Sequence, residues 1–164
     1  MIASVASAVG AGVVAVEQHP HRASLVSDAV AHLAPAGVTV VATDVRDYLA
    51  VAGVWDLIVL DAPCTGLGAL RRRPEARWRK QPGDLAALVD IQRSLIASSA
   101  DALADGGHLV YITCSPVVAE TTEVISWLLG TRDDVVALDT AAILQKVVLT
   151  PMTGVSVGTA VQLW

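Results

Sequence analysis

The sequence predicts an α/β domain with a mainly parallel β-sheet, because strand-like and helix-like segments alternate along the chain. The strand-like segments are short apolar runs rich in valine and isoleucine, and most are followed by apolar residues at helical spacing. With 164 residues, of which 54% are hydrophobic and 16% charged, the chain has enough apolar side chains for a folded core. We therefore expect residues 1–164 to form one domain.

Four segments have the composition of buried strands. Each is a run of β-branched and other apolar residues with polar or turn-forming residues at its ends. The predicted strands are 13–17, 38–44, 55–63 and 108–114. Two valine-rich segments near the C-terminus, 135–138 and 146–149, predict two further short strands.

Three other segments have apolar residues at helical spacing. The predicted helices are 19–33, 84–104 and 119–130. The helix at 84–104 begins at Asp84, a residue type that caps helix N-termini, and Gly106 and Gly107 follow its end. Before this helix, residues 64–83 contain repeated glycine and proline, which indicates a loop.

Five residues with acidic or nucleophilic side chains lie at or just after the ends of predicted strands. They are Glu17, Asp44, Asp61, Cys64 and Cys114. In a parallel sheet the carboxyl ends of the strands share one edge, and ligands bind beyond that edge. The five positions together therefore predict one binding and reaction site at the edge of the sheet.

Glu17 and Asp44 suit the binding of a nucleotide cofactor. A carboxylate that closes a strand of a nucleotide-binding fold can accept hydrogen bonds from both ribose hydroxyls, which fits Glu17. Asp44 closes the next strand, where an adenine amino group can be recognised. Two alternatives stay open: Glu17 as a solvated strand end, and Asp44, in "TDVRD", as the cap of a helix.

The two cysteines admit four interpretations. Free cysteine is common as a buried apolar side chain. A disulfide is disfavoured, because the sequence shows no secretion signal and so predicts a cytoplasmic protein with reduced thiols. A metal site is disfavoured, because there is no Cys-x-x-Cys and the four histidines lack ligand spacing. The fourth interpretation is catalytic, since a thiolate beside positive charge is a strong nucleophile.

Charge is unevenly distributed along the chain. The net charge of −5 by itself argues against a nucleic acid partner. However, six of the eleven lysines and arginines lie within residues 71–80: Arg71, Arg72, Arg73, Arg77, Arg79 and Lys80. This segment is either an electrostatic contact for nucleic acid or a solvated surface loop. No membrane partner is expected, because the uncharged N-terminal stretch, 1–16, is shorter than the roughly 20 residues that a membrane helix needs.

Three segments of the chain match motifs of a known enzyme family. They are "LDAPCTGLGALRRRPEARWR", "IQRSLI" and "GGHLVYITCSP". Together they resemble the Sun/Fmu-type (NOL/NOP/Sun) RNA (cytosine-5)-methyltransferases, over residues 5–164. The resemblance implies a Rossmann-like sheet, S-adenosylmethionine as cofactor, and RNA, in particular ribosomal RNA, as partner.

The resemblance implies that Cys114, in the Thr-Cys motif, is the catalytic nucleophile and that Cys64, in the Pro-Cys motif, helps to release the product. The reaction needs a nucleophile because carbon 5 of cytosine is too electron-poor to attack a methyl donor. Addition of a thiolate to carbon 6 makes carbon 5 enamine-like, so that it can take the methyl group. Removal of the carbon 5 proton then allows the thiol to be eliminated.

The resemblance also implies binding roles. Glu17, Asp44 and Asp61 match the acidic positions of the cofactor pocket, and Asp61 can equally contact the target base. Residues 71–80 would hold RNA phosphates, and Trp78 is available to stack on a base. The target base must be unpaired or flipped out for a thiolate to reach its ring.

The chain departs from the family pattern in several places. It has no glycine-rich "PGGK" segment, and the "GAG" at 10–12 precedes a predicted strand rather than following one. Thr121 stands where asparagine is typical. We therefore expect a partial catalytic domain whose sheet lacks the first and last strands, and which binds S-adenosylmethionine weakly or not at all.

Two other functions stay open. One is a non-catalytic RNA-binding remnant that uses residues 71–80. The other is a methyltransferase of proteins or small molecules. Direct methyl transfer to an amine needs no enzyme nucleophile, so the two cysteine motifs argue against this last function.

Overall fold

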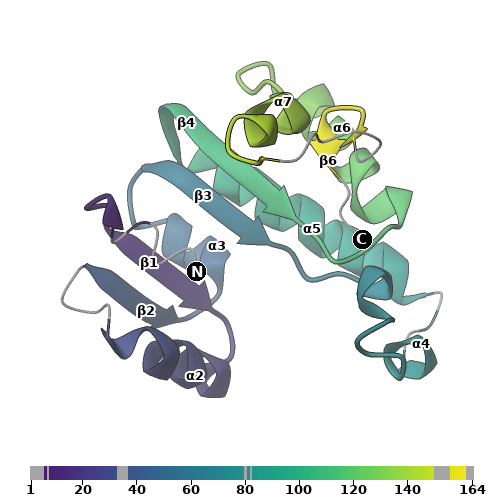
Figure 1. Cartoon of the computed structure of the whole chain (residues 1–164), viewed down its shortest axis with the longest axis horizontal. Coiled ribbons are helices and arrows are strands. Elements are labelled where there is room, and N and C mark those ends of the chain that lie inside the picture. The colour runs from purple at the N-terminus through teal and green to yellow at the C-terminus, as the bar shows by residue number, and fades with distance from the viewer. Residues whose placement is uncertain are drawn as a thin grey trace. The chain divides into compact units, whose positions relative to one another are not determined.

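The fold is described from a computed structural model of the chain, shown in Figure 1. The structure describes residues 6, 8–32, 37–79, 81, 83–149 and 156–161. The chain forms two compact units, Met1–Trp55 and Asp56–Trp164, and the expectation of a single domain stays a prediction. In the part of the chain that is described, no helix combines the length and the apolar character that crossing a membrane requires.

The first unit is built on two parallel strands, β1 (Val13–Glu17) and β2 (Val38–Ala42), which pair along their whole length. Helix α2 (Pro20–Val30) connects the strands and packs on both, so they form a β-α-β crossover. Pro20 lies in the first turn of α2, where its fixed φ suits a helix and its missing N–H costs no hydrogen bond. Helix α3 (Val45–Leu49) follows β2.

The second unit is built on strands β3 (Trp55–Asp61) and β4 (Leu103–Ile112), which are neighbours in a two-stranded sheet. Figure 1 shows the two arrows side by side and pointing the same way, so their carboxyl ends lie at the same edge. Helix α5 (Asp84–Asp101) lies between these strands in sequence and packs on β4 and on helix α6 (Thr122–Thr131).

Helix α5 contributes one face to the core of the second unit. The buried residues recur at helical spacing: Gln92, Leu95, Ile96, Ser99 and Ala100. Val124 and Leu128, four residues apart on α6, are also buried. Because Gln92 lies on this buried face, its amide must find hydrogen-bond partners inside the unit.

Shorter elements connect the main ones. The segment between β3 and α5 contains the short helices η2 (Leu67–Ala69) and α4 (Ala76–Arg79), and η3 (Val118–Glu120) precedes α6. The remaining described elements are α7 (Thr140–Gln145), β5 (Ser156–Val157) and β6 (Ala160–Val161). The last two strands form an antiparallel hairpin, and α7 contacts its second strand.

The α/β class and the order of four strands and three main helices up to residue 131 are confirmed, with boundaries shifted by a few residues. The largest shift concerns the long helix, which ends at Asp101, so that β4 begins at Leu103 rather than at 108. Gly106 therefore lies inside β4, where it has a φ of 74°.

The strands predicted at 135–138 and 146–149 are wrong. The first segment has no regular structure, and the second is a turn and bend after α7. Asp139 stabilises α7 between them, because its side chain accepts a hydrogen bond from Ala142 N at 2.9 Å. A valine-rich composition favours a strand only where a partner strand is present, and Val136 is 79% exposed.

Asp84 also differs from its predicted role. Gly83 is the N-cap of α5, and Asp84 is the first helical residue. The Asp84 carboxylate accepts a hydrogen bond from Gln81 N at 2.9 Å, so it stabilises the turn before the helix. A carboxylate at this position also interacts favourably with the positive end of the helix dipole.

Candidate active site

Two loops carry the cysteines to the same edge of the β3–β4 sheet. The Pro-Cys loop (62–66) follows β3, and the Thr-Cys loop (113–116) follows β4. A backbone hydrogen bond of 2.9 Å joins the first residue of the Pro-Cys loop to the last residue of β4. As a result, Cys64 Sγ lies 3.4 Å from Cys114 Sγ. The structure thus brings together the two thiols that the strand-end pattern places on one edge.

The two thiols differ in exposure, and burial changes the pKa of Cys64. Both are free, with Cys64 half-buried and Cys114 exposed. Burial, followed by the hydrogen bond with Cys114, raises the pKa of the Cys64 thiol to about 11. Cys64 is therefore protonated at neutral pH, and Cys114 is the sulfur that an incoming molecule can reach.

Two glycines allow the chain to pass close to Cys114. Gly66 has a φ of 72°, in the left-handed region that favours glycine. Gly68 N donates a hydrogen bond to Cys114 O at 2.9 Å. A Cβ at Gly68 would lie 3.0 Å from that same oxygen, so any larger residue would push the Thr-Cys loop away.

A buried carboxylate lies beneath the two loops. Glu120, which has 0% exposure, accepts hydrogen bonds from Thr65 N at 2.7 Å and from Thr65 Oγ1 at 2.5 Å. It also accepts from Ser115 Oγ at 2.5 Å and from Gln92 Nε2 at 3.1 Å. Burial raises the pKa of Glu120, but these donors lower it by more, so its pKa lies below the usual value. Glu120 is therefore an ionised carboxylate with four donors, which we call the Glu120 network.

Neither Glu120 nor Gln92 is among the site residues that the sequence predicts. Glu120 lies just before an apolar helix and is indistinguishable there from an ordinary acidic residue of the first turn. A signal was present at Gln92, which shares its face of α5 with Leu95 and Ile96. A polar residue on an otherwise apolar helix face indicates a buried hydrogen-bond partner.

Glu17 and Asp44 lie in the first unit, each at or after the end of a strand. Glu17 Oε1 accepts a hydrogen bond from His19 N at 3.0 Å, and Oε2 pairs with Arg22 at 3.1 Å. Asp44 caps α3 by accepting from Arg46 N at 2.9 Å, which confirms the helix-cap interpretation. The hydrogen bond from the Arg46 guanidinium, at 2.6 Å, is the main cause that lowers the pKa of Asp44 to about 2. The cofactor roles of both residues stay predictions.

Asp61 is the last residue of β3, and it lies three positions before Cys64. Its side chain is exposed, and no hydrogen-bond or ion-pair partner for it lies among the described residues. A carboxylate at this position is free to contact a ligand. Over the described ranges, no group of three or more His, Cys, Asp or Glu side chains is placed to hold a metal ion.

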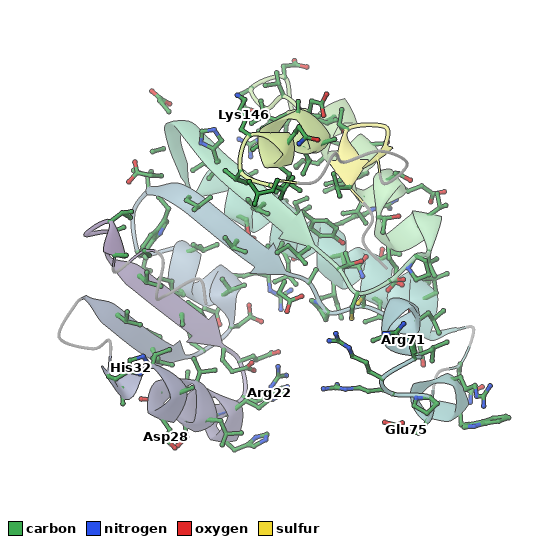
Figure 2. The ribbon with its side chains drawn as sticks, in the orientation of Figure 1. Arg22, Asp28, His32, Arg71, Glu75 and Lys146 are labelled. Atoms are coloured by element: carbon green, nitrogen blue, oxygen red, sulfur yellow. The ribbon has the colours of Figure 1, made fainter. Side chains whose placement is uncertain are left out.

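The basic loop (residues 71–80) follows η2 and includes α4, and Figure 2 labels Arg71 and Glu75 on it. The side chains of its described basic residues are exposed: Arg71, Arg72, Arg73 and Arg77. Trp78 is 77% exposed, and the Arg77 guanidinium lies 5.0 Å from the centre of its ring. The structure does not describe Lys80 or the side chain of Arg79.

The chain is similar to methyltransferases of known sequence and structure. The methyltransferase-like protein Rv1407 of Mycobacterium tuberculosis is 45% identical over 154 residues, which are 94% of this chain and 32% of that protein. The ribosomal RNA small subunit methyltransferase F of Serratia proteamaculans is 41% identical over 52% of this chain and 18% of that protein. The structure of NSun6 from Pyrococcus horikoshii, solved with SFG, has a TM-score of 0.66 and 26% identity.

The NSun6 similarity covers 74% of this chain and 31% of that one, and it confirms the Rossmann-like methyltransferase fold. The chain spans about a third of the length of the Mycobacterium tuberculosis relative. The model of the family "16S rRNA methyltransferase RsmB/F" matches residues 1–157, which include both cysteine loops, the Glu120 network and the basic loop. Because this match covers nearly the whole sequence and contains every motif that carries the resemblance, the chain belongs to the 16S rRNA methyltransferase RsmB/F family.

Proposed function

We propose that this chain carries the catalytic thiols of an enzyme that methylates carbon 5 of a cytosine in ribosomal RNA, with S-adenosylmethionine as methyl donor. The observation that supports this most is the pair of sulfurs 3.4 Å apart, of which one is exposed and the other is half-buried with a raised pKa. Methylation of an amine or a hydroxyl would need neither thiol. SFG, an analogue of S-adenosylmethionine, in the NSun6 structure supports the choice of donor.

Cys114 is the nucleophile in this proposal. Its exposed sulfur can approach the ring of an unstacked cytosine, as the thiolate forms a bond to carbon 6. The electron pair displaced from the ring double bond makes carbon 5 nucleophilic. Carbon 5 would then form a bond to the methyl carbon while the bond from that carbon to the donor's sulfonium sulfur breaks, leaving a neutral thioether. S-adenosylmethionine supplies that methyl group in an electrophilic form.

Cys64 assists the release of the product. After carbon 5 loses its proton to a base, the bond between Cys114 Sγ and carbon 6 breaks and its electron pair returns to sulfur. The Cys64 S–H lies within hydrogen-bond distance of that sulfur and, because of its raised pKa, keeps its proton at neutral pH. It can therefore donate to the departing thiolate and stabilise it.

Glu17 fits the ribose of the donor. A carboxylate offers about four acceptor positions, and Glu17 uses one for His19 N and one for the Arg22 ion pair. Acceptor positions for the two ribose hydroxyls therefore stay available. Asp44 fits less well, because three donor atoms of Arg46 already bind its two oxygens.

The basic loop supports an RNA substrate. Three consecutive exposed arginines, 71–73, can contact successive phosphates, and the exposed Trp78 ring can stack on an unpaired base. These contacts would position a single-stranded segment, which is the form in which a cytosine ring is accessible to a thiolate.

The test of this function is a covalent trap. RNA that carries 5-fluorocytidine is incubated with the protein and a large excess of S-adenosylmethionine, because weak binding of the donor is expected. Carbon 5 then carries a fluorine in place of the proton that a base must remove, so the adduct persists. We expect a complex that survives a denaturing gel and disappears in Cys114→Ala. Loss of the complex in Cys64→Ala instead would reverse the two roles. RNA binding without any adduct would favour the alternative, a non-catalytic RNA-binding protein that uses residues 71–80.

A further inference from the structure

A buried ionised carboxylate is costly, and Glu120 is one of two charged or amide side chains in the described core with 0% exposure. Removing a charge from water is tolerated only where hydrogen-bond donors replace the water. Glu120 has four such donors, and they keep its pKa below the usual value. The question is what this buried charge does that an apolar residue would not.

The four donors come from three segments that are distant in sequence. Thr65 is adjacent to Cys64, Ser115 is adjacent to Cys114, and Gln92 lies on α5. Glu120 Oε2 accepts from the hydroxyls of both Thr65 and Ser115, which lie 3.1 Å from each other. One carboxylate oxygen therefore fixes the residue next to each cysteine.

The same network holds the Pro-Cys loop at a second point. Gln92 Nε2 donates to Glu120 Oε1 at 3.1 Å and to Pro63 O at 2.8 Å, so it binds the residue before Cys64. Glu120 itself is held by Tyr111, whose hydroxyl donates to the Glu120 backbone oxygen at 2.9 Å. The loop residues on both sides of Cys64 are thus tied to one anchor on the scaffold.

We propose that Glu120 is the positioning residue that sets the separation of the Cys64 and Cys114 sulfurs, through its hydrogen bonds to Thr65 and Ser115. The effect of Glu120 on methylation rests on the proposed function. Its effect on the separation of the two thiols does not, because that separation can be tested without RNA or methyl donor.

Two substitutions separate positioning from general stability. Glu120→Ala removes the acceptor for all four donors and leaves both loops without their common anchor. Glu120→Gln keeps the shape, and its amide oxygen can still accept from Thr65 N and Gln92 Nε2. Its amide nitrogen, however, can only donate to the Thr65 and Ser115 hydroxyls, so both hydroxyls must turn and their short hydrogen bonds to a charged oxygen are lost. Glu123→Ala is the matched control, because Glu123 is an exposed acidic residue three positions away.

The experiment measures how fast the two thiols form a disulfide. The probe is diamide, a diazene oxidant that takes two electrons and two protons as the sulfur–sulfur bond forms. Each variant of the full chain is oxidised well below its thermal midpoint, and the rate is divided by the rate in concentrated urea. Dividing by the rate in urea removes differences in reagent and thiol concentration, so a change in this ratio between variants reports a change in how the folded state presents the two thiols.

We expect the ratio to fall roughly 100-fold in Glu120→Ala, by analogy with the cost of misplacing reacting groups by about 1 Å. We expect a smaller loss in Glu120→Gln and no change in Glu123→Ala. Equal ratios in the wild type and Glu120→Gln, with both folded by near-ultraviolet circular dichroism, would overturn the proposal even if Glu120→Ala fails to fold. A wild type that oxidises rapidly but forms no adduct with 5-fluorocytidine RNA would instead contradict the proposed function and leave the positioning role intact.

Discussion

Cys64 Sγ lies 3.4 Å from Cys114 Sγ, although the two residues are 50 positions apart in the sequence. Two adjacent strands that point the same way bring their loops together, and one thiol stays exposed while the other is half-buried. This difference in burial separates their chemistry, because burial raises the pKa of Cys64 and keeps it protonated. An exposed nucleophile beside a proton-bearing thiol suits the formation and the release of a covalent intermediate.

Cys64→Ala is expected to accumulate the covalent adduct with unmodified RNA. The variant keeps the exposed Cys114 nucleophile but loses the S–H group that stabilises the departing thiolate. Attack should therefore proceed while release slows by roughly 100- to 1,000-fold, which is typical for loss of one hydrogen-bond donor to a developing charge. A denaturing gel with labelled RNA measures the adduct, and Cys114→Ala is the control. A Cys64→Ala protein that turns over at the wild-type rate would contradict the assignment of Cys64.

The stability of the protein is expected to fall at alkaline pH partly through Cys64. Burial raises the pKa of this thiol from an ordinary value of 9.0 to about 11, so the folded state favours the protonated form. That contribution to stability is fully present below about pH 9 and is lost as the pH rises through about 11. Urea unfolding from neutral to alkaline pH should show a steeper loss in the wild type than in Cys64→Ala. Parallel curves would contradict the raised pKa.

Gly68→Ala is expected to impair catalysis more than stability. Its new Cβ would lie 3.0 Å from Cys114 O and 3.3 Å from Cys114 C, so the Thr-Cys loop must move by a few tenths of an ångström or more. We expect the rate of adduct formation to fall by roughly 10- to 100-fold, since misplacement by about 1 Å costs about 100-fold. Gly130→Ala is the control, because nothing lies within 4 Å of its added Cβ and alanine favours the α6 helix. Equal rates for the two variants would contradict this account of Gly68.

The order of the strands, and the position of both cysteines at one edge of the sheet, could be predicted from the sequence. Strand periodicity is a local property, and a residue that follows a parallel strand must lie at the carboxyl edge of the sheet. The sequence shows such a strand before both Cys64 and Cys114, because an apolar run precedes each of them. The same reasoning places Asp61 at the edge of the second unit, where it is exposed.

The Glu120 network could not be predicted in the same way. Glu120 binds Thr65, 55 positions earlier, and Gln92, 28 positions earlier, so its burial depends on tertiary packing rather than on local pattern. The wrong strands near the C-terminus have a related cause. The valine content there favours extended structure, but the cap at Asp139 and the lack of a described partner strand favour α7 instead.

Asp44→Ala is expected to destabilise the protein by about 1 kcal/mol at neutral pH, the typical cost of removing an N-cap. Asp44→Asn should cost less, because its side-chain oxygen can still accept from Arg46 N. Arg46 lowers the pKa of Asp44 from 3.8 to about 2, so this stabilisation is present above about pH 4 and is lost as the pH falls through about 2. Urea unfolding of the three proteins between these pH values measures the effect. A difference between the wild type and Asp44→Ala that stays constant down to about pH 2 would contradict it.

Binding of single-stranded RNA is expected to depend on salt through the basic loop. Each phosphate contact made by lysine or arginine contributes about 0.7 to the slope of log affinity against log salt concentration for single strands. Replacement of Arg71, Arg72 and Arg73 by alanine should therefore weaken binding and reduce that slope by about 2 if each contacts one phosphate. Fluorescence anisotropy with a labelled oligonucleotide at several salt concentrations measures both quantities.

Arg132→Ala is the matched control for this RNA experiment. Arg132 also belongs to the second unit, but its guanidinium pairs with Asp101 and Asp134, so its charge is already balanced within the protein. Its removal should leave the slope unchanged. Trp78→Ala should weaken binding by about 1–3 kcal/mol without changing the slope, because stacking on a base releases no counterion. An unchanged slope in the triple arginine variant, or an equal reduction in Arg132→Ala, would show that the basic loop is only a solvated surface.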